Sequence, residues 1–265
     1  MRIIVPIKQV PETSAVKMDE RTGTMIRQGV EAIINPLDLY AIETAIRLCE
    51  RSSGETVAIS MGPPNAASAL REAIAMGCDT GILLSDKAFG GADTWATSYV
   101  LSAAIRRIGG YDLIICGERA TDGDTGQVGP GIAAWLNLPV MTYVSRINSI
   151  DERSCSVRRL VEDGYEVLEA ELPAVLTVVK EVADPRLPTL RGKQKARRLE
   201  VPVWGPLDLE VESEHLGLEG SPTRVVNISR PKLARECELV RASDEESTHA
   251  GVDRLIAFLR GRELI

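Results

Sequence analysis

Short apolar runs that alternate with longer segments of helical periodicity constrain the fold of this chain more than any other feature. The runs are IIVPI (3–7), TVAIS (56–60), GILLS (81–85), LIIC (113–116) and PVMT (139–142). Each run is almost continuously apolar, which is typical of strands that are covered on both faces. The helical segments between them span 36–51, 64–77, 93–109 and 128–136. Because strands and helices that alternate in this way form right-handed crossovers, we predict an α/β fold with an open, doubly wound, mainly parallel sheet.

Two regions depart from this alternation. Residues 17–29 resemble a small hairpin that turns at Thr22-Gly23 before the first helix. After residue 139 the helical segments stop, and 143–151, 154–164 and 165–179 are predicted to be antiparallel strands joined by polar turns. We therefore expect an α/β domain over residues 1–204. From about residue 183 the chain is rich in proline and is expected to be irregular. Residues 205–265 are expected to form a C-terminal arm that ends in an amphipathic helix (247–264) and packs on a partner chain.

Composition excludes several classes of function. A net charge of -7 argues against a nucleic-acid-binding or anionic membrane surface. The five cysteines form no CxxC pair and the two histidines have no ligand-spaced partners, so we expect free thiols in a reducing compartment and no metal site. The chain shows no signal peptide and no apolar stretch of the roughly 18–20 residues that span a membrane. We therefore expect a cytoplasmic protein.

Known catalytic motifs are missing from the sequence. It contains no GxxxxGK[ST] phosphate loop, no GxGxxG after the first strand, and no Ser/His/Asp or Cys/His set. We therefore predict no catalytic residue, and any redox chemistry would have to come from a bound cofactor.

Four loops are predicted to meet at one edge of the sheet. In an open parallel α/β sheet, ligands bind beyond the carboxyl ends of the strands. The loops at that position are 8–11 together with 34–38, 60–64, 85–94 and 117–127, and all are rich in Gly, Pro, Asp or Thr. Each leads into a helix start, whose unpaired N–H groups bind a phosphate without any lysine.

The loop GERATDGDTGQ (117–127) illustrates both possible interpretations of such a loop. Gly123 and Gly126 would let the backbone approach a phosphate, with Thr125 and Gln127 as hydrogen-bond donors. Asp122 and Asp124 would repel phosphate oxygens, so we expect them to accept hydrogen bonds from a ribose or an adenine, or to cap the following helix. An ordinary strand-to-helix turn remains the alternative.

A second glycine-rich loop, FGGADTWATS (89–98), has the same two interpretations. Asp93 or Thr94 is expected to cap the next helix, and Thr94 and Thr97 share one face of its first turn. Two such loops at one edge of one sheet favour a nucleotide site, because a dinucleotide needs several separate contacts along its length.

Taken together, the motifs resemble a known family. KQVPET, INPLDLYAIETA, SMGPP, FGGADTWATS, DGDTGQVGP and TLRGKQKAR follow one another as they do in the β subunit of electron-transfer flavoproteins. FGGADT with DGDTGQVGP is most similar to the electron-bifurcating type. The resemblance implies an adenine-nucleotide α-hydrolase-like fold and FAD as the bound nucleotide. The other branch of the family, which holds AMP at the same place, is the alternative.

The resemblance also implies which residues bind the nucleotide. By position these are Pro6, Asn35, Pro36, Leu37, Asp38, Met61, Gly62, Gly90, Gly91, Ala92, Asp93, Thr94, Thr97, Gly117, Asp122, Gly123, Asp124, Thr125, Gly126, Gln127 and Val128. In such a protein the β-subunit flavin takes a hydride from NADH. One electron goes to a low-potential acceptor such as ferredoxin or flavodoxin, and the other passes through an FAD of the α subunit to an acyl-CoA dehydrogenase.

The segment RLPTLRGKQKARR (186–198) holds six basic residues and no acidic one. A solvated basic helix face is one interpretation. The resemblance implies a recognition loop, here about 184–199, in which Leu190 anchors on the partner dehydrogenase while neighbouring charges steer docking. The docking residues so implied are Leu190, Arg191, Lys193, Lys195 and Arg197.

A different class of function also fits an α/β chain with a nucleotide site. A stand-alone nucleotide-binding regulator, or an adenylyl-transferring enzyme, would be a stable monomer that needs neither the basic segment nor the C-terminal arm. Tight ATP binding by the monodisperse lone chain would favour that class.

Overall fold

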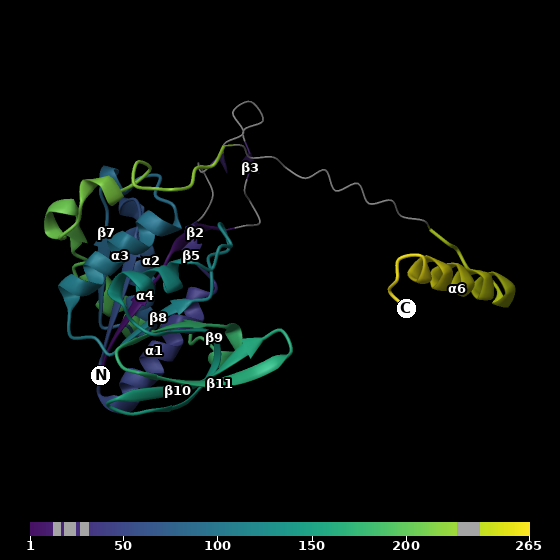
Figure 1. Cartoon of the computed structure of the whole chain (residues 1–265), viewed down its shortest axis with the longest axis horizontal. Coiled ribbons are helices and arrows are strands. Elements are labelled where there is room, and N and C mark those ends of the chain that lie inside the picture. Colours follow the sequence, from purple (N-terminus) through teal and green to yellow (C-terminus); the bar gives the residue numbers. More distant parts are fainter. Residues whose placement is uncertain (13–16, 19–24, 27–31, 227–238) are drawn as a thin grey trace. The chain divides into compact units, whose positions relative to one another are not determined.

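The apolar runs of the sequence become the strands of one large sheet. The computed structural model describes residues 1–12, 17–18, 25–26, 32–226 and 239–265, and in these residues the sheet has nine strands in the order β11-β10-β9-β12-β8-β1-β6-β7-β13 (Figure 1). The strands are β1 (Arg2–Pro6), β6 (Glu55–Met61), β7 (Thr80–Leu84), β8 (Leu113–Gly117), β9 (Val140–Ile150), β10 (Ser154–Val161), β11 (Gly164–Glu171), β12 (Ala174–Val178) and β13 (Val203–Trp204).

The order of pairing places a topological switch point beside β1. From β1 the chain adds β6 and then β7 on one side, and it then returns to place β8 on the other side of β1. All these pairs are parallel, which confirms the predicted doubly wound sheet. Neighbouring crossovers therefore leave β1 and β8 in opposite directions, and this is where sheets of this kind open a crevice for ligands.

Helices cover the sheet on both faces. The helices are α1 (Asp38–Ser52), α2 (Ala67–Met76), α3 (Thr94–Ile108), α4 (Val128–Leu136), α5 (Leu190–Arg198) and α6 (Glu245–Arg260). Apolar residues of α1 and α2, such as Ile42 and Leu70, share one buried cluster with one face of the strands. Residues of α3 and α4, such as Val100 and Ile132, share a second cluster with the opposite face. Because every central strand is apolar on both faces, each is buried between two helical layers.

The antiparallel region is confirmed for three strands and wrong for a fourth. Strands β9, β10 and β11 pair antiparallel, as predicted. The end of the segment 165–179, however, forms β12, which pairs parallel with β8 and β9. All five residues of β12 are buried, and its unbroken apolar run AVLTV is the pattern of a central parallel strand rather than of a half-exposed antiparallel one.

Two short two-stranded sheets accompany the first crossover. β2 (Gln9–Pro11) pairs with β5 (Ala32–Ile34), and β3 (Lys17–Met18) pairs antiparallel with β4 (Met25–Ile26). The second pair agrees with the hairpin that the sequence predicts, while the predicted turn at Thr22-Gly23 lies outside the described residues.

Contacts divide the chain into two compact units, Met1–Asn227 and Ile228–Ile265. The proline-rich segment is not irregular throughout, because α5 lies within it. In the second unit, α6 begins at the cap residue Asp244. Val252, Leu255 and Phe258 of this helix recur at three-residue spacing and are each about half exposed among the described residues, so α6 carries a partly exposed apolar stripe. No helix in the described parts of the chain is long and apolar enough to cross a membrane.

Candidate functional site

A cavity of about 1030 Å³ opens at the carboxyl ends of β1, β6, β7 and β8. Its walls come from the loops that follow these strands and from the first turns of α3 and α4. The predicted site residues that line it are Pro6, Asp38, Met61, Gly62, Gly90, Gly91, Ala92, Asp93, Thr94, Thr97, Gly117, Gly123, Asp124, Thr125, Gly126, Gln127 and Val128. The loops that the sequence placed at one edge of the sheet therefore do meet around one cavity.

Four predicted residues do not line the cavity: Asn35, Pro36, Leu37 and Asp122. Asn35 is fully buried, and its amide nitrogen donates to the Asp38 carboxylate and to the Arg119 carbonyl, both at 2.9 Å. Its amide oxygen accepts from the N–H of Thr121 at 3.1 Å. Asn35 therefore holds the start of α1 against the loop after β8, and in the structure its role is to position the cavity wall.

Glycine is required where the loop after β8 passes the start of α1. A Cβ on Gly117 would overlap Asp38 Oδ1 and would lie 2.9 Å from the carbonyl carbon and oxygen of Leu37. At Gly123, in the same loop, an added Cβ would meet no atom within 4 Å. The glycines of this loop therefore serve different purposes, and only Gly117 is fixed by the packing of the cavity floor.

The two helices that begin at the cavity have different N-termini. Asp93 caps α3, since its Oδ1 accepts from the N–H groups of Trp95 at 2.9 Å and Ala96 at 3.1 Å. Helix α4 begins after Gln127 without a side-chain cap, so the suggestion that Asp122 or Asp124 caps this helix is wrong. An uncapped helix start with Val128 in the cavity wall is a favourable place for an anion.

The two aspartates of the glycine-rich loop pair with cations instead of capping the helix. Asp122 Oδ1 accepts from Lys8 Nζ at 2.7 Å, and Asp124 lies 3.0 Å from Nε of Arg119. The two glycine-rich loops also touch each other, because the Thr94 hydroxyl donates to Oε1 of Gln127 at 3.0 Å. These contacts neutralise the acidic loop and keep the uncapped end of α4 as the electropositive part of the wall.

Asp38 is a buried carboxyl in the cavity wall. Burial raises its pKa to about 7, although the Lys8 N–H at 2.7 Å, the Asn35 amide at 2.9 Å and the charge of Lys8 oppose the rise. A protonated Asp38 is a hydrogen-bond donor, whereas the ionised form only accepts. The side chain therefore changes its hydrogen-bonding character near neutral pH.

We expect Asp38 to make the ligand-free protein less stable as the pH rises. Because its folded pKa is raised above the value of 3.8 for an exposed carboxyl, the folded state binds the extra proton between about pH 4 and 7, and its ionisation costs free energy above that range. Between pH 5 and 8 the free energy of unfolding should fall on the order of 2 kcal/mol relative to Asp38→Asn. Denaturant unfolding of both proteins at the two pH values measures the difference, and parallel pH profiles would contradict the assignment.

Sequence reasoning missed several residues of the wall. Lys8, Phe89, Leu101 and Cys116 line the cavity but were not among the residues predicted to bind the nucleotide, although Lys8 and Phe89 lie in loops that were predicted to meet there. Lys8 could have been found, because it directly follows the first apolar run. Sequence reasoning also missed Tyr143, which does not line the cavity but has a φ of 56° within β9 and a hydroxyl that would lie 3.9 Å from a Cβ on Gly126. A bulky residue with positive φ indicates local strain, and no sequence pattern reveals it.

The basic segment forms a short helix that is held in place at both ends. Thr189 caps α5 by accepting from the N–H of Gly192 at 2.9 Å, and a Cβ on Gly192 would overlap the Ala75 carbonyl of α2. Of the predicted docking residues, Leu190 is 87% exposed, whereas the Lys195 ammonium donates to the Cys78 carbonyl at 3.1 Å. Leu190 is therefore available to a partner, and Lys195 also has a structural role.

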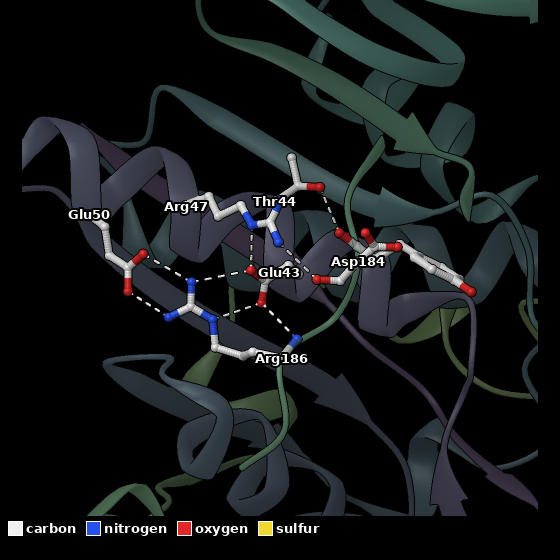
Figure 2. A network of polar contacts seen from close by, with 7 residues as sticks. Glu43, Thr44, Arg47, Glu50, Asp184 and Arg186 are labelled. Carbon is white, nitrogen blue, oxygen red and sulfur yellow. Dashed lines mark hydrogen bonds and ion pairs between the residues drawn. The ribbon is translucent and has the colours of Figure 1, made fainter. Parts of the chain in front are cut away.

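An ionic network centred on the buried carboxylate of Glu43 fixes the chain before α5 to helix α1 (Figure 2). Arg186 donates from Nε to Glu43 Oε2 at 2.8 Å and from Nη1 to Glu50 Oε1 at 2.6 Å. Arg47 donates to Glu43 Oε1 at 2.5 Å and to the Asp184 carbonyl at 3.0 Å. The Glu43 side chain is only 1% exposed. The start of the basic segment, at Arg186, is therefore held by the Glu43 carboxylate, whose buried charge is stabilised by Arg186 and Arg47.

The family model and two similar relatives name the same family. Residues 22–209 match the family model described as "Electron transfer flavoprotein domain". The chain is 47% identical over 256 residues to the electron transfer flavoprotein subunit beta of Thermoanaerobacterium thermosaccharolyticum, covering 96% of this chain and 98% of the relative. It is 48% identical over 241 residues to the caffeyl-CoA reductase-Etf complex subunit CarD of Acetobacterium woodii, covering 91% and 92%.

A third relative extends the comparison to a differently named group. Protein FixA of Azotobacter vinelandii is 42% identical over 253 residues, covering 93% of this chain and 90% of FixA. The family model covers more than half of the chain, and the relatives match it over almost their whole length. The chain therefore belongs to the electron transfer flavoprotein family, as a protein of the β-subunit type.

Proposed function

We propose that this chain is the β subunit of a heterodimeric, electron-bifurcating electron-transfer flavoprotein and that it holds FAD in the cavity described above. Bound FAD would accept a hydride from NADH and pass on single electrons, which is chemistry that no side chain of the cavity supplies. One electron would go to a ferredoxin or flavodoxin, and the other to an FAD of the α subunit and then to an acyl-CoA dehydrogenase.

The observation that carries the proposal is the cavity at the switch point of the sheet, where two glycine-rich loops meet an uncapped helix start. Its volume of about 1030 Å³ lies just above the range of roughly 300–1000 Å³ for ligand pockets and is large enough for a dinucleotide. The start of α4 suits a pyrophosphate, and the hydroxyls of Thr94, Thr97 and Thr125 suit a ribose or ribityl chain.

The partners are proposed on separate grounds. Family membership supports an α subunit, and we propose that residues 205–265 act as the arm that packs on it, with the apolar stripe of α6 as its contact surface. One relative is named as part of a caffeyl-CoA reductase-Etf complex, which supports an acyl-CoA oxidoreductase as the electron partner.

Anaerobic titration of the purified αβ complex with NADH tests the proposed electron donor. The bifurcating assignment predicts that NADH bleaches the flavin absorbance of two flavins per heterodimer. A complex that contains one flavin, or whose flavins NADH does not reduce, would contradict it and would favour the AMP-binding branch.

We expect Leu190→Ala to slow electron transfer to the dehydrogenase without affecting the heterodimer. Leu190 is exposed beside basic side chains, as an anchor for a partner pocket would be, and the loss of such an anchor weakens binding by about 2 kcal/mol or more. Stopped-flow transfer to the dehydrogenase should show a KM raised at least about tenfold.

Val167→Ala provides the control for that experiment. Val167 is also an exposed apolar residue, but it lies on β11, outside both the basic segment and the C-terminal arm. An equal change in KM for both variants, or none for Leu190→Ala, would remove the docking role.

A further inference from the structure

The loop Gly90–Asp93, which forms one wall of the cavity, is held from outside by a segment that no motif singled out. Residues 216–223 follow the strands of the sheet, near the start of the C-terminal arm (205–265), and they lie in the same compact unit as the cavity. We refer to residues 216–223 as the strap. The N–H of Leu218 donates to the Gly90 carbonyl at 3.1 Å.

The strap packs closely against the two glycines of the loop. Gly91 has a φ of 76°, and a Cβ built on it would lie 3.1 Å from Cβ of Leu218. Within the strap, Gly217 has a φ of 56°, and its own Cβ would overlap the carbonyl oxygen of Ala88. Backbone therefore lies against backbone here, and the two segments cannot move apart without losing these contacts.

Asp93 connects the strap to helix α3. Its Oδ1 caps α3, while its Oδ2 accepts from the Thr223 hydroxyl at 2.7 Å and from the Thr223 N–H at 3.0 Å. The N–H of Asp93 donates to the hydroxyl oxygen of Ser221 at 2.8 Å, and that hydroxyl donates in turn to the Gly217 carbonyl at 2.6 Å. Ser221 is only 8% exposed. One carboxylate thus fixes both the first turn of α3 and the strap.

From this geometry we infer that Ser221 and Thr223 are positioning residues of the nucleotide site, and that the strap links the rest of the C-terminal arm to the cavity. This inference rests on the proposed function, because it requires a nucleotide against the Gly90–Asp93 loop. If the strap stabilises the conformation of the Gly90–Asp93 loop that binds the nucleotide, nucleotide binding must stabilise the strap to the same extent, because such coupling is reciprocal. A partner that engages the arm would then act on nucleotide retention through residues 216–223.

The αβ complex with Thr223→Val tests the inference. Valine keeps the volume of threonine and the backbone N–H that donates to Asp93, but it removes the hydroxyl that donates to the same carboxylate oxygen. We expect bound nucleotide to dissociate about tenfold faster, as followed by the rise in flavin fluorescence on release. Amide hydrogen exchange at Trp95 and Ala96 should also become faster, because their acceptor is the carboxylate that Thr223 holds.

Thr223→Ser and Ser154→Ala complete the experiment. Thr223→Ser keeps the hydroxyl and should restore nucleotide retention to within about twofold of the parent complex. Ser154 on β10 donates from its hydroxyl to the Glu169 carboxylate on β11 at 2.9 Å. Ser154→Ala is therefore the matched control for the loss of a hydroxyl–carboxylate bond whose residues do not line the cavity. All three variants should unfold thermally close to the parent.

The possible results separate this inference from the proposed function. A parent complex that carries no nucleotide on this subunit would refute the proposed function and the inference with it. A nucleotide-bound parent whose dissociation rate is unchanged by Thr223→Val, or is raised equally by Thr223→Ser, would refute the role of the strap alone.

Discussion

Replacing Gly117 with alanine is expected to empty the cavity of its nucleotide. The added Cβ would overlap Asp38 Oδ1 and press on the Leu37 carbonyl, and neither is the movable end of a flexible side chain. The loop after β8 must shift or α1 must move, and overpacking of this kind costs about 1–3 kcal/mol, sometimes more. We expect nucleotide binding to weaken about a hundredfold and the free energy of unfolding to fall by a similar energy.

Gly123→Ala is the matched control for Gly117→Ala. It adds the same methyl group to the same loop and the same cavity wall, but no atom lies within 4 Å of the new Cβ. Nucleotide content after gel filtration and denaturant unfolding should be close to those of the parent. Full nucleotide retention by Gly117→Ala, or equal losses in both variants, would show that the packing around Gly117 does not set the shape of the site.

Removing Arg186 should destabilise the protein strongly, because Arg186 pairs with the buried carboxylate of Glu43. Arg186→Ala leaves the buried carboxylate of Glu43 with Arg47 as its remaining charged partner, and breaking a buried ion pair costs about 3–5 kcal/mol. Because Arg47 stays in place, we expect about 3 kcal/mol. Amide hydrogen exchange across α5 should also become faster, since Arg186 holds the chain that leads into it.

The pH dependence of the loss of stability in Arg186→Ala shows whether Glu43 is the carboxylate that Arg186 stabilises. Burial alone would raise the pKa of Glu43, but the hydrogen bonds from Arg186 and Arg47 outweigh burial and lower it below the usual 4.5. This stabilisation is complete above about pH 4.5 and is lost as the pH falls through the lowered pKa. The difference between the parent and Arg186→Ala should therefore be largest at neutral pH and shrink in acid.

Arg71→Ala, at an exposed position of α2, controls for the loss of a surface arginine. It should change the free energy of unfolding by less than about 0.5 kcal/mol. If Arg186→Ala were equally mild, or if its effect did not depend on pH, Glu43 could not be the group that Arg186 stabilises.

The central fold could be predicted because local pattern and global fold agree there. The run LIIC and the segment VGPGIAAWL correspond to β8 and α4 almost residue for residue, since strands that are buried on both faces and helices that follow glycine-rich turns have strong local signals. The meeting of the loops followed from the predicted parallel sheet, because the carboxyl ends of parallel strands share an edge.

The errors arose where long-range contacts decide the structure. The parallel pairing of β12 depends on a return from the edge of the sheet to its centre, and no local pattern specifies that return. Helix α5 lies in a region expected to be irregular, although a basic helix was one interpretation of 186–198; Thr189 caps the helix and Gly192 packs on α2. Likewise, neither the Arg186 network nor the bond between Asp93 and Thr223 has a sequence signature, because their partners are more than one hundred residues apart.

The cavity at the switch point is the central claim, and releasing and counting the nucleotides of the purified αβ complex tests it most directly. Acid release followed by chromatography should give two FAD and no AMP per heterodimer, and the Gly117→Ala complex should retain only the FAD of the α subunit. One FAD with one AMP would contradict the bifurcating assignment. A complex whose β subunit yields no adenine nucleotide would contradict the site itself.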